Sequence, residues 1–230
     1  MQITLSTAAT SPHIHGMTYT DPRSYLYQSG LLDPDAAQRI TRDALKACDD
    51  GELYLQYSAT ESFGFDDGRL KMADYSTGSG FGLRGVSGEM TGFAHANEIS
   101  AAAIRRAGET LTLLDPAKTA MAAAPRQNNR HLYTDGDPIG LIPFADKVAL
   151  CQKIDAAARA RDPRVAQVTV GLSASWSVVE VVRADGFVAT DIRPLVRLNV
   201  SIVAEEKKEG KTLNREYIGD DSSEAEQWDD

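Results

Sequence analysis

The sequence has little cysteine and no long apolar run. Cys48 and Cys151 are the two cysteines of the 230 residues, and thiols so far apart indicate neither a disulfide framework nor a zinc ribbon. A reducing compartment is the simpler interpretation. No apolar run approaches the ~20 residues that span a bilayer, and residues 1–20 lack the basic start and apolar stretch of a leader. We therefore expect a cytoplasmic protein with no membrane segment.

An excess of basic residues is also missing. Lys and Arg number 24 against 33 Asp and Glu, so the formal net charge is −9 and the pI is near 5.0. Proteins that neutralise nucleic-acid phosphates carry the opposite charge, so nucleic acid is not expected as a direct ligand. Hydrophobic residues make up 42% and charged residues 25% of the chain, which is typical of a soluble globular protein with a buried core. The length fits one large or two small domains.

Motifs for metal binding and for nucleophilic catalysis are absent from the sequence. The four histidines include no pair one helical turn apart with a glutamate between them. His13-Ile14-His15 lacks a third ligand, and His95 lies in a strand-like stretch, where a packed or surface histidine is expected. Neither Ser79 nor Ser87 stands in a G-x-S-x-G turn. The two cysteines lie on apolar helical faces, which favours a structural role for both. We therefore assign no catalytic residue and no metal ligand.

The first part of the chain predicts an α+β unit over residues 31–115, after a flexible arm at residues 1–30. A helix is expected from the N-cap Asp33 and Pro34 to a stop at Gly51. Alternating apolar residues from Leu53 then predict a strand that runs to a hairpin turn at residues 66–68. Further strands are expected at residues 80–87 and 91–96, followed by a helix over 99–114.

The second part repeats this order after a connector at residues 116–142. A central α+β unit over 143–218 begins with a helix that ends at Asp162-Pro163. The following strands are expected at 168–172, 178–183, 187–193, 196–202 and 212–218, mainly antiparallel. The acidic tail, residues 219–230, is expected to be disordered. Both units place a helix before a long strand and an Asp-Gly turn, so a weak internal duplication is a further expectation.

Two features suggest ligands without specifying them. Gly80–Gly85 matches G-x-G-x-x-G, but a dinucleotide site needs a helix after that loop, whereas strand-forming residues follow here. Glycines that let the strand bend or another backbone approach closely are the preferred interpretation. Arg183, Arg193 and Arg197 fall on or near one strand pair, where they could bind a peptide backbone or a carboxylate. The alternative for these arginines is a solvated sheet face or an internal ion pair.

Two long segments resemble the TldD/PmbA (TldE) family, in particular the N-terminal part of a TldD-like subunit. The first combines Gly51–Tyr57, the Asp67-Gly68 turn and Gly80–Ala94. The second combines Ala184-Asp185-Gly186 with Asp191–Val200. Both segments stand in the expected order, and together they cover roughly residues 31–210.

The resemblance implies a cytoplasmic prokaryotic zinc metalloprotease, assembled as a heterodimer of TldD-like and PmbA-like subunits, that cleaves unfolded or extended peptides. The family holds its zinc with an H-E-x-x-x-H motif in the C-terminal part of the chain, and this sequence does not contain that motif. We therefore expect a truncated or divergent chain that lacks the C-terminal catalytic domain, carries no zinc of its own and is inactive alone.

Three functions remain open at this point. The chain is expected to be the peptide-holding and subunit-assembly portion of a TldD-like metalloprotease. The alternative is a free-standing, non-catalytic interaction module that binds a PmbA-like partner or a peptide. A small-molecule enzyme that uses the Gly80–Gly85 loop is the third possibility. Strand edges left uncovered by a missing domain also predict self-association of the isolated chain.

Overall fold

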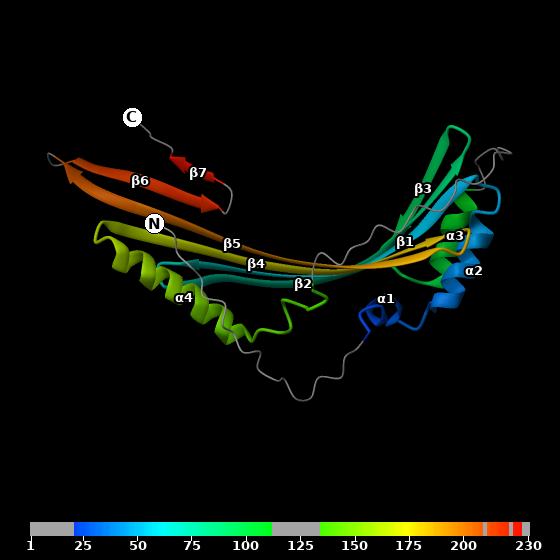
Figure 1. Cartoon of the computed structure of the whole chain (residues 1–230), viewed down its shortest axis with the longest axis horizontal. Helices are drawn as coiled ribbons and strands as arrows, with labels where there is room; N and C mark the ends of the chain where they lie inside the picture. Colours follow the sequence, from blue (N-terminus) through cyan, green and yellow to red (C-terminus); the bar gives the residue numbers. More distant parts are fainter. Residues whose placement is uncertain (1–20, 112–133, 209–210, 221–222, 227–230) are drawn as a thin grey trace.

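The computed structural model describes residues 21–111, 134–208, 211–220 and 223–226. These residues form four helices and seven strands (Figure 1). In chain order the elements are α1 (Ser24–Tyr27), α2 (Pro34–Ala44), β1 (Asp50–Asp66), β2 (Arg69–Ser87), β3 (Met90–Ala96), α3 (Ala101–Leu111), α4 (Phe144–Arg161), β4 (Val165–Arg183), β5 (Val188–Lys208), β6 (Lys211–Asp220) and β7 (Ser223–Glu226).

All seven strands belong to one antiparallel sheet in the order β3-β2-β1-β4-β5-β6-β7. The α+β class expected from the sequence is thereby confirmed. The first three strands and the last four are meanders, and β1 joins them by pairing with β4, for example Leu53 with Val182. Both expected units thus contribute to a single sheet. Their division into domains stays a prediction, and the internal duplication is not confirmed.

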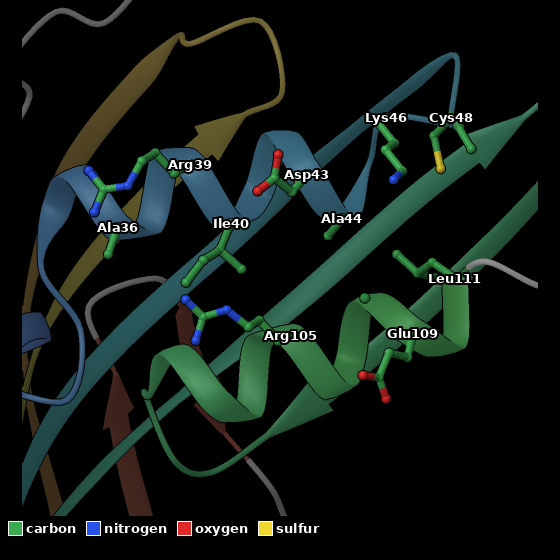
Figure 2. Close-up of a pocket in the computed structure, with 12 residues that line it drawn as sticks. Ala36, Arg39, Ile40, Asp43, Ala44, Lys46, Cys48, Arg105, Glu109 and Leu111 are labelled. Atoms are coloured by element: carbon green, nitrogen blue, oxygen red, sulfur yellow. The ribbon is translucent and has the colours of Figure 1, made fainter.

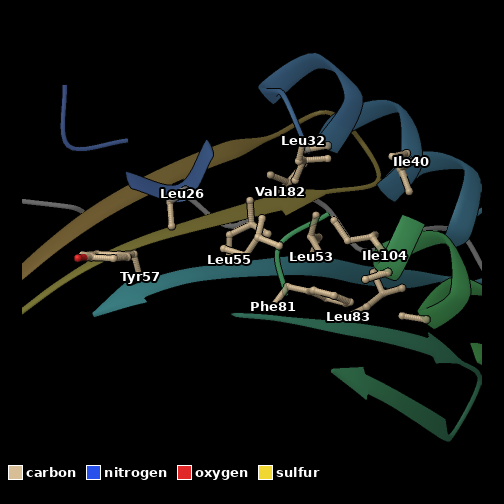
Figure 3. Close-up of a cluster of buried hydrophobic side chains, with 14 of the residues drawn as sticks. Leu26, Leu32, Ile40, Leu53, Leu55, Tyr57, Phe81, Leu83, Ile104 and Val182 are labelled. Atoms are coloured by element: carbon tan, nitrogen blue, oxygen red, sulfur yellow. The ribbon is translucent and has the colours of Figure 1, made fainter. Parts of the chain in front are cut away.

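The helices cover one face of the sheet, which carries both parts of the core. Along β1 every second side chain from Leu53 to Ala59, and again Phe63 and Phe65, is buried. The first group packs under α1, α2 and α3 with Leu83, Ile104 and other residues (Figure 3). The second group packs under α4, whose Cys151 is 1% exposed. Figure 1 shows α4 near one end of the long strands and the other helices near the opposite end.

Helix α2 begins as expected and ends earlier. The Asp33 carboxylate accepts a hydrogen bond from the Ala36 amide at 2.7 Å, and Pro34 occupies the first helical position. The helix ends at Ala44, before the predicted stop at Gly51, and the chain then turns tightly into β1. A Cβ at Gly51 would lie 2.4 Å from the Arg84 carbonyl oxygen, so this position needs glycine because β2 passes so close.

Three strands are longer than the sequence predicts. β4 joins the strands expected at 168–172 and 178–183 into one strand, Val165–Arg183. β2 begins directly after the turn at Asp67 and Gly68, whose φ angles of 46° and 72° suit a tight hairpin, and it continues unbroken to Ser87. β5 passes through Pro194, where a strand boundary was expected. The Arg183 amide donates to the Phe187 carbonyl, so by the alternation of antiparallel hydrogen bonds Pro194 faces away from β4. Proline is tolerated there because no described strand pairs with β5 on that side before Val200.

The expected flexible ends contain ordered elements. Within the expected arm, α1 buries Leu26 to 1% exposure; residues 1–20, with His13-Ile14-His15, lie outside the described residues. Within the expected disordered tail, β6 extends to Asp220 and β7 pairs with it, so that expectation is wrong for these strands. The connector is described only from residue 134 onward. Over the described ranges, no helix is both long and apolar enough to cross a membrane.

Candidate functional site

The second face of the sheet is polar and carries no described helix. The alternate residues of β1, from Glu52 to Thr60, point to this face and are only half-buried or exposed. Beside them lie Gly78, Gly80 and Gly82 of β2 and the serines of β4. Most of these side chains are small or polar, although the exposed Phe93 and Leu195 lie on the same face. We call this surface the open face.

A shallow pocket of about 370 Å³ lies on the open face where β3 ends. Its lining includes Tyr54, Gln56, Ser58, Gly78, Gly80, Gly82, His95 and Asn97. His95 is exposed, so of the two roles expected for it, packed or surface, the structure supports the surface one. A Cβ at Gly80 would lie 2.7 Å from the Ala96 carbonyl oxygen, which confirms that this glycine permits close approach of another backbone. Because Gly80–Gly85 lies inside β2 and opens no helix, the loop lacks the geometry of a dinucleotide site.

The structure does not bring the three candidate arginines together. Arg183 is 8% exposed and forms ion pairs with Asp50 at 2.8 Å and Asp185 at 3.3 Å, at the end of β4. It therefore has the internal ion pair that was the alternative to ligand binding. Arg193 and Arg197 are exposed and share the open face of β5. Arg193 pairs with Asp191 at 2.7 Å, and this hydrogen bond raises the pKa of the guanidinium.

A buried carboxylate that the sequence analysis missed ties α1 to the sheet. Glu180 on β4 is 1% exposed and lies on the helix-covered face. It accepts hydrogen bonds from Arg23 at 2.6 Å, from the Tyr27 hydroxyl and from Thr190 at 3.2 Å. Burial, followed by the bond to Glu180, raises the pKa of Tyr27. The sequence signal was an acid inside the apolar run Val178–Val182. Three donors satisfy the buried charge, so this cluster acts as an anchor.

A groove of about 430 Å³ is lined by residues of α2 and α3 (Figure 2). Arg39, Asp43, Lys46, Cys48, Arg105 and Glu109 are among its lining residues. Burial raises the pKa of the Cys48 thiol, and it does the same for Cys151 under α4. A raised pKa disfavours the thiolate that a nucleophile needs. Both cysteines are free, and their environments agree with the structural roles predicted for them.

The part of the chain that the structure describes offers no donor set for zinc. No three His, Cys, Asp or Glu side chains among residues 21–111, 134–208, 211–220 and 223–226 group closely enough to hold a metal ion. Structural and catalytic zinc sites use at least three protein ligands. The described residues therefore do not fit the metal that the family resemblance implies, and no chemical step is assigned to it in this chain.

Comparison with family models gives two consecutive matches. The PmbA/TldA metallopeptidase domain 1 matches residues 51–124, and the PmbA/TldA metallopeptidase central domain matches residues 137–229. Comparison with curated proteins gives the metalloprotease TldD homolog of Buchnera aphidicola (subsp. Schizaphis graminum), 37% identical over 161 residues, which are 69% of this chain and 33% of that protein. The TldD homolog of Haemophilus influenzae is 35% identical over 162 residues, or 69% of this chain and 34% of that protein. The chain thus spans about a third of the length of these relatives.

Solved structures share the fold at lower identity. A candidate modulator of DNA gyrase from Bacteroides thetaiotaomicron superposes with a TM-score of 0.59 at 15% identity, over 80% of this chain and 44% of that one. TldE from Thermococcus kodakarensis gives a TM-score of 0.54 at 17% identity, over 79% of this chain and 42% of that one. At such identities the likeness concerns the fold alone.

Proposed function

The chain belongs to the PmbA/TldD metallopeptidase family, and from this premise we propose that it is the N-terminal, peptide-holding and subunit-assembly portion of a TldD-like zinc metalloprotease. In this proposal, another part of the enzyme supplies the zinc and the hydrolytic groups, and none of the residues described here belongs to that part. The partner is a TldE-like subunit, the substrates are unfolded or extended peptides, and the compartment is the cytoplasm.

The observation that carries the proposal is the long sheet with one uncovered, polar face. β1, β2, β4 and β5 are each longer than a typical strand of about five or six residues, and the helices near their two ends pack on the opposite face. An extended peptide fits a flat surface of small and polar side chains, because its backbone needs donors and acceptors and little depth. Subunit assembly likewise needs a broad surface outside the chain's own core.

Co-expression of the 230-residue chain with a TldE-like protein of the same organism tests assembly. We expect the two chains to co-elute as a heterodimer in size-exclusion chromatography, and the 230-residue chain to bind labelled extended peptides without cleaving them. Loss of both kinds of binding would overturn the proposal. Tight stoichiometric zinc binding, together with peptide cleavage by this chain alone, would also overturn it.

Arg193 and Arg197 belong to this proposal as contacts for peptide carboxylates on the open face. The double variant Arg193→Ala/Arg197→Ala is expected to weaken binding of an acidic peptide by up to about thirtyfold, since exposed charge pairs contribute up to about 1 kcal/mol, or about fivefold, each. Arg164→Ala is the matched control, because Arg164 is exposed and pairs locally with Asp162. Equal binding by both variants in a fluorescence anisotropy titration would remove the arginines from the proposal.

A further inference from the structure

Helices α2 and α3 lie side by side and run in the same direction. A Cβ at Gly108 would lie 2.8 Å from the Ala44 Cβ, and one helical turn earlier Arg105 and Ile40 line the same groove (Figure 2). The floor of this groove consists of small or apolar side chains, namely Ala36, Ile40, Ala44, Ala47, Gly108 and Leu111. Packed helices have axes about 8–10 Å apart, and the distance depends on the side chains at the contact. The floor can therefore pack closely against another helix.

Charged side chains stand beside the floor, and their sign changes along the groove. Arg39 and Arg105 come first, and Asp43 and Glu109 follow one helical turn later on the same two helices. All four residues are exposed. Arg39 and Asp43 are four residues apart on α2, yet neither forms an ion pair within the part of the chain that the structure describes. The groove thus has a basic half and an acidic half, and its charges on α2 are available to a partner.

This order of charges is complementary to its own reverse. When α2 of a second copy lies antiparallel on α2 and the two share the midpoint between Arg39 and Asp43, Arg39 of each copy faces Asp43 of the other. The same reversal turns Arg105 and Glu109 of α3 towards the opposite half of the other groove. A parallel copy would set base against base and acid against acid, which opposes association. The groove therefore fits a second copy in one orientation.

The remaining charged residue of the groove, Lys46, agrees with this orientation. In the antiparallel arrangement it lies at the level of Ala36 in the other copy, next to the exposed Asp35 in the first turn of α2. The other exposed arginines of the two helices, Arg42 and Arg106, do not line the groove. All the charges that line it thus have a partner of opposite sign in an antiparallel second copy.

A contact in which both copies use the same surface has a two-fold axis and closes on itself. The axis here crosses the groove at right angles to both helices, so assembly stops at two molecules. Helices α2 and α3 pack on the helix-covered face of the sheet, which leaves the open face accessible to peptides in the dimer. This inference goes beyond the proposed function and does not depend on it.

We propose that the groove between α2 and α3 holds a second copy of this chain in a two-fold symmetric dimer. α2 packs antiparallel on α2 of the other copy, the two apolar floors cover each other, and Arg39 and Asp43 form reciprocal ion pairs. Since the contact comprises two helices of 11 residues in each copy, the dimer is reversible, and it weakens as salt screens the ion pairs.

Sedimentation equilibrium of the 230-residue chain tests the dimer. At low ionic strength and up to about 0.5 mM protein, a dimer with a dissociation constant as weak as about 1 mM is still detected. We expect an equilibrium of monomer and dimer without larger species, and a higher dissociation constant in high salt. A chain that stays monomeric at this concentration would overturn the proposal, and so would growth into open-ended oligomers.

Two complementary variants test the ion pairs. Arg39→Glu/Arg105→Glu makes the groove acidic, and Asp43→Lys/Glu109→Lys makes it basic. Each variant alone is expected to weaken the dimer by at least about tenfold, because like charges then face each other. An equimolar mixture of the two is expected to dimerise at least as tightly as the wild type.

The matched control is Arg69→Glu/Arg106→Glu, which makes the same change of charge at two exposed arginines outside the groove and should dimerise like the wild type. Circular dichroism and the melting temperature verify that each variant is folded. If the acidic and basic variants dimerise like the wild type, or if their mixture does not recover, the dimer uses another surface and the proposal is overturned.

Disulfide cross-linking tests the orientation. In a Cys48→Ala background, a mixture of the Arg39→Cys and Asp43→Cys variants is expected to form a cross-linked dimer under mild oxidation, whereas Arg39→Cys alone is not. Cross-linking of Arg39→Cys with itself in preference to Asp43→Cys would show a parallel arrangement and overturn the proposal.

Co-elution with a TldE-like subunit separates this inference from the proposed function. We expect Arg39→Glu/Arg105→Glu to co-elute with that subunit as the wild type does. If the wild-type chain is monomeric alone and co-elutes with the subunit, the second-copy dimer is wrong and the assembly function stands. If the acidic variant also loses co-elution, the groove binds the TldE-like subunit in place of a second copy.

Discussion

At the scale of single residues, Glu180 shows how a charge can hold a helix onto a sheet. Its carboxylate is almost completely buried, and Arg23 and Tyr27 of the α1 region reach it from a sequence separation of more than 150 residues. Helix α1 has only four residues and no side-chain cap, so local propensity cannot hold it in place. Its position depends on Leu26 in the core and on this hydrogen-bonded cluster.

Replacement of Glu180 by Gln is therefore expected to destabilise the protein. The change removes the charge that pairs with Arg23 and places an amide NH₂ group beside donors, so we expect the free energy of unfolding to fall by about 2 kcal/mol. Asp191→Asn is the control, because Asp191 and Arg193 form an exposed pair on the open face, and a change within about 0.5 kcal/mol is expected there. Urea denaturation measures both values; similar losses in the two variants would contradict the role given to Glu180.

Asp162 supplies a pH dependence at acid pH. A hydrogen bond from the Arg164 side chain, aided by one from its amide, lowers the Asp162 pKa from 3.8 to about 2. A carboxylate whose pKa is lower in the folded state stabilises that state above its unfolded pKa, and this contribution is lost as the pH falls through the folded pKa. The contribution should thus be complete above about pH 4 and disappear towards about pH 2.

Asp162→Asn is expected to flatten the fall of the melting temperature in that window and to leave the slope near neutral pH unchanged. Melting curves between pH 2 and 7 measure the effect. Asp35→Asn, which changes an acid in the first turn of α2, serves as the control. A slope between pH 4 and 2 as steep as that of the wild type would show that Asp162 does not contribute.

At the scale of elements, the strands show why some boundaries could be predicted and others could not. The Asp33 cap, the turn at Asp67-Gly68 and the end of α4 before Asp162-Pro163 are local signals, and the structure confirms them. The continuation of β5 through Pro194 depends on which side of the strand faces a neighbour. That information lies in the pairing of distant segments, which a local pattern does not contain. β7 was missed for the same reason, since it forms by pairing with β6.

Glycines in β2 offer a matched test of close packing within an element. Gly80→Ala is expected to lower the free energy of unfolding by about 1–3 kcal/mol, because the new Cβ would lie 2.7 Å from the Ala96 carbonyl oxygen and push the end of β3 away. Gly82→Ala, two residues along the same face, has no atom within 4 Å of the new Cβ and should change stability by less than about 0.5 kcal/mol. Chemical denaturation measures the free energy of unfolding of both variants. Equal losses of stability would contradict the close contact between Gly80 and the end of β3.

Pro194 provides a second test at this scale. Pro194→Thr gives the β5 edge the donor that it lacks, so we expect the variant to self-associate more strongly than the wild type as concentration rises. Leu195, Val196 and Leu198, exposed at 65%, 57% and 43%, would support such pairing. Sedimentation velocity at increasing concentrations measures the change, with Val196→Thr as the control. Identical concentration dependence in the two variants would contradict a protective role for Pro194.

At the scale of the whole molecule, the sequence predicted the class and the family, and it did not predict the site. The α+β class and the alternation of Leu53, Leu55 and Tyr57 follow from side-chain periodicity. The separation of Arg183 from Arg193 and Arg197 does not, because the three are near in sequence but lie at different levels of two paired strands. Residues of three strands line the pocket beside His95. The local sequence pattern does not show which strands lie side by side, so it did not predict this pocket either.

The shared sheet predicts a gradient of local stability. β1 and β4 lie in the middle and are paired on both sides, whereas β3 and β7 lie at the edges. Native-state hydrogen exchange should therefore be slowest for amides of β1 and β4 and much faster for those of β3 and β7. Slow exchange confined to one of the two expected units would instead show that they unfold separately.

Two strands of the described sheet are paired on one side only over part of their length, β2 over Arg69–Gly80 and β5 over Val188–Asn199. Pairing of the β2 edge of one molecule with the β5 edge of the next would be a head-to-tail contact, and repeated contacts of that kind grow into open-ended filaments. Pro194 and the charges of Arg193 and Arg197 disfavour pairing at the β5 edge. We therefore expect a long and partly unpaired sheet not to lead by itself to fibrils.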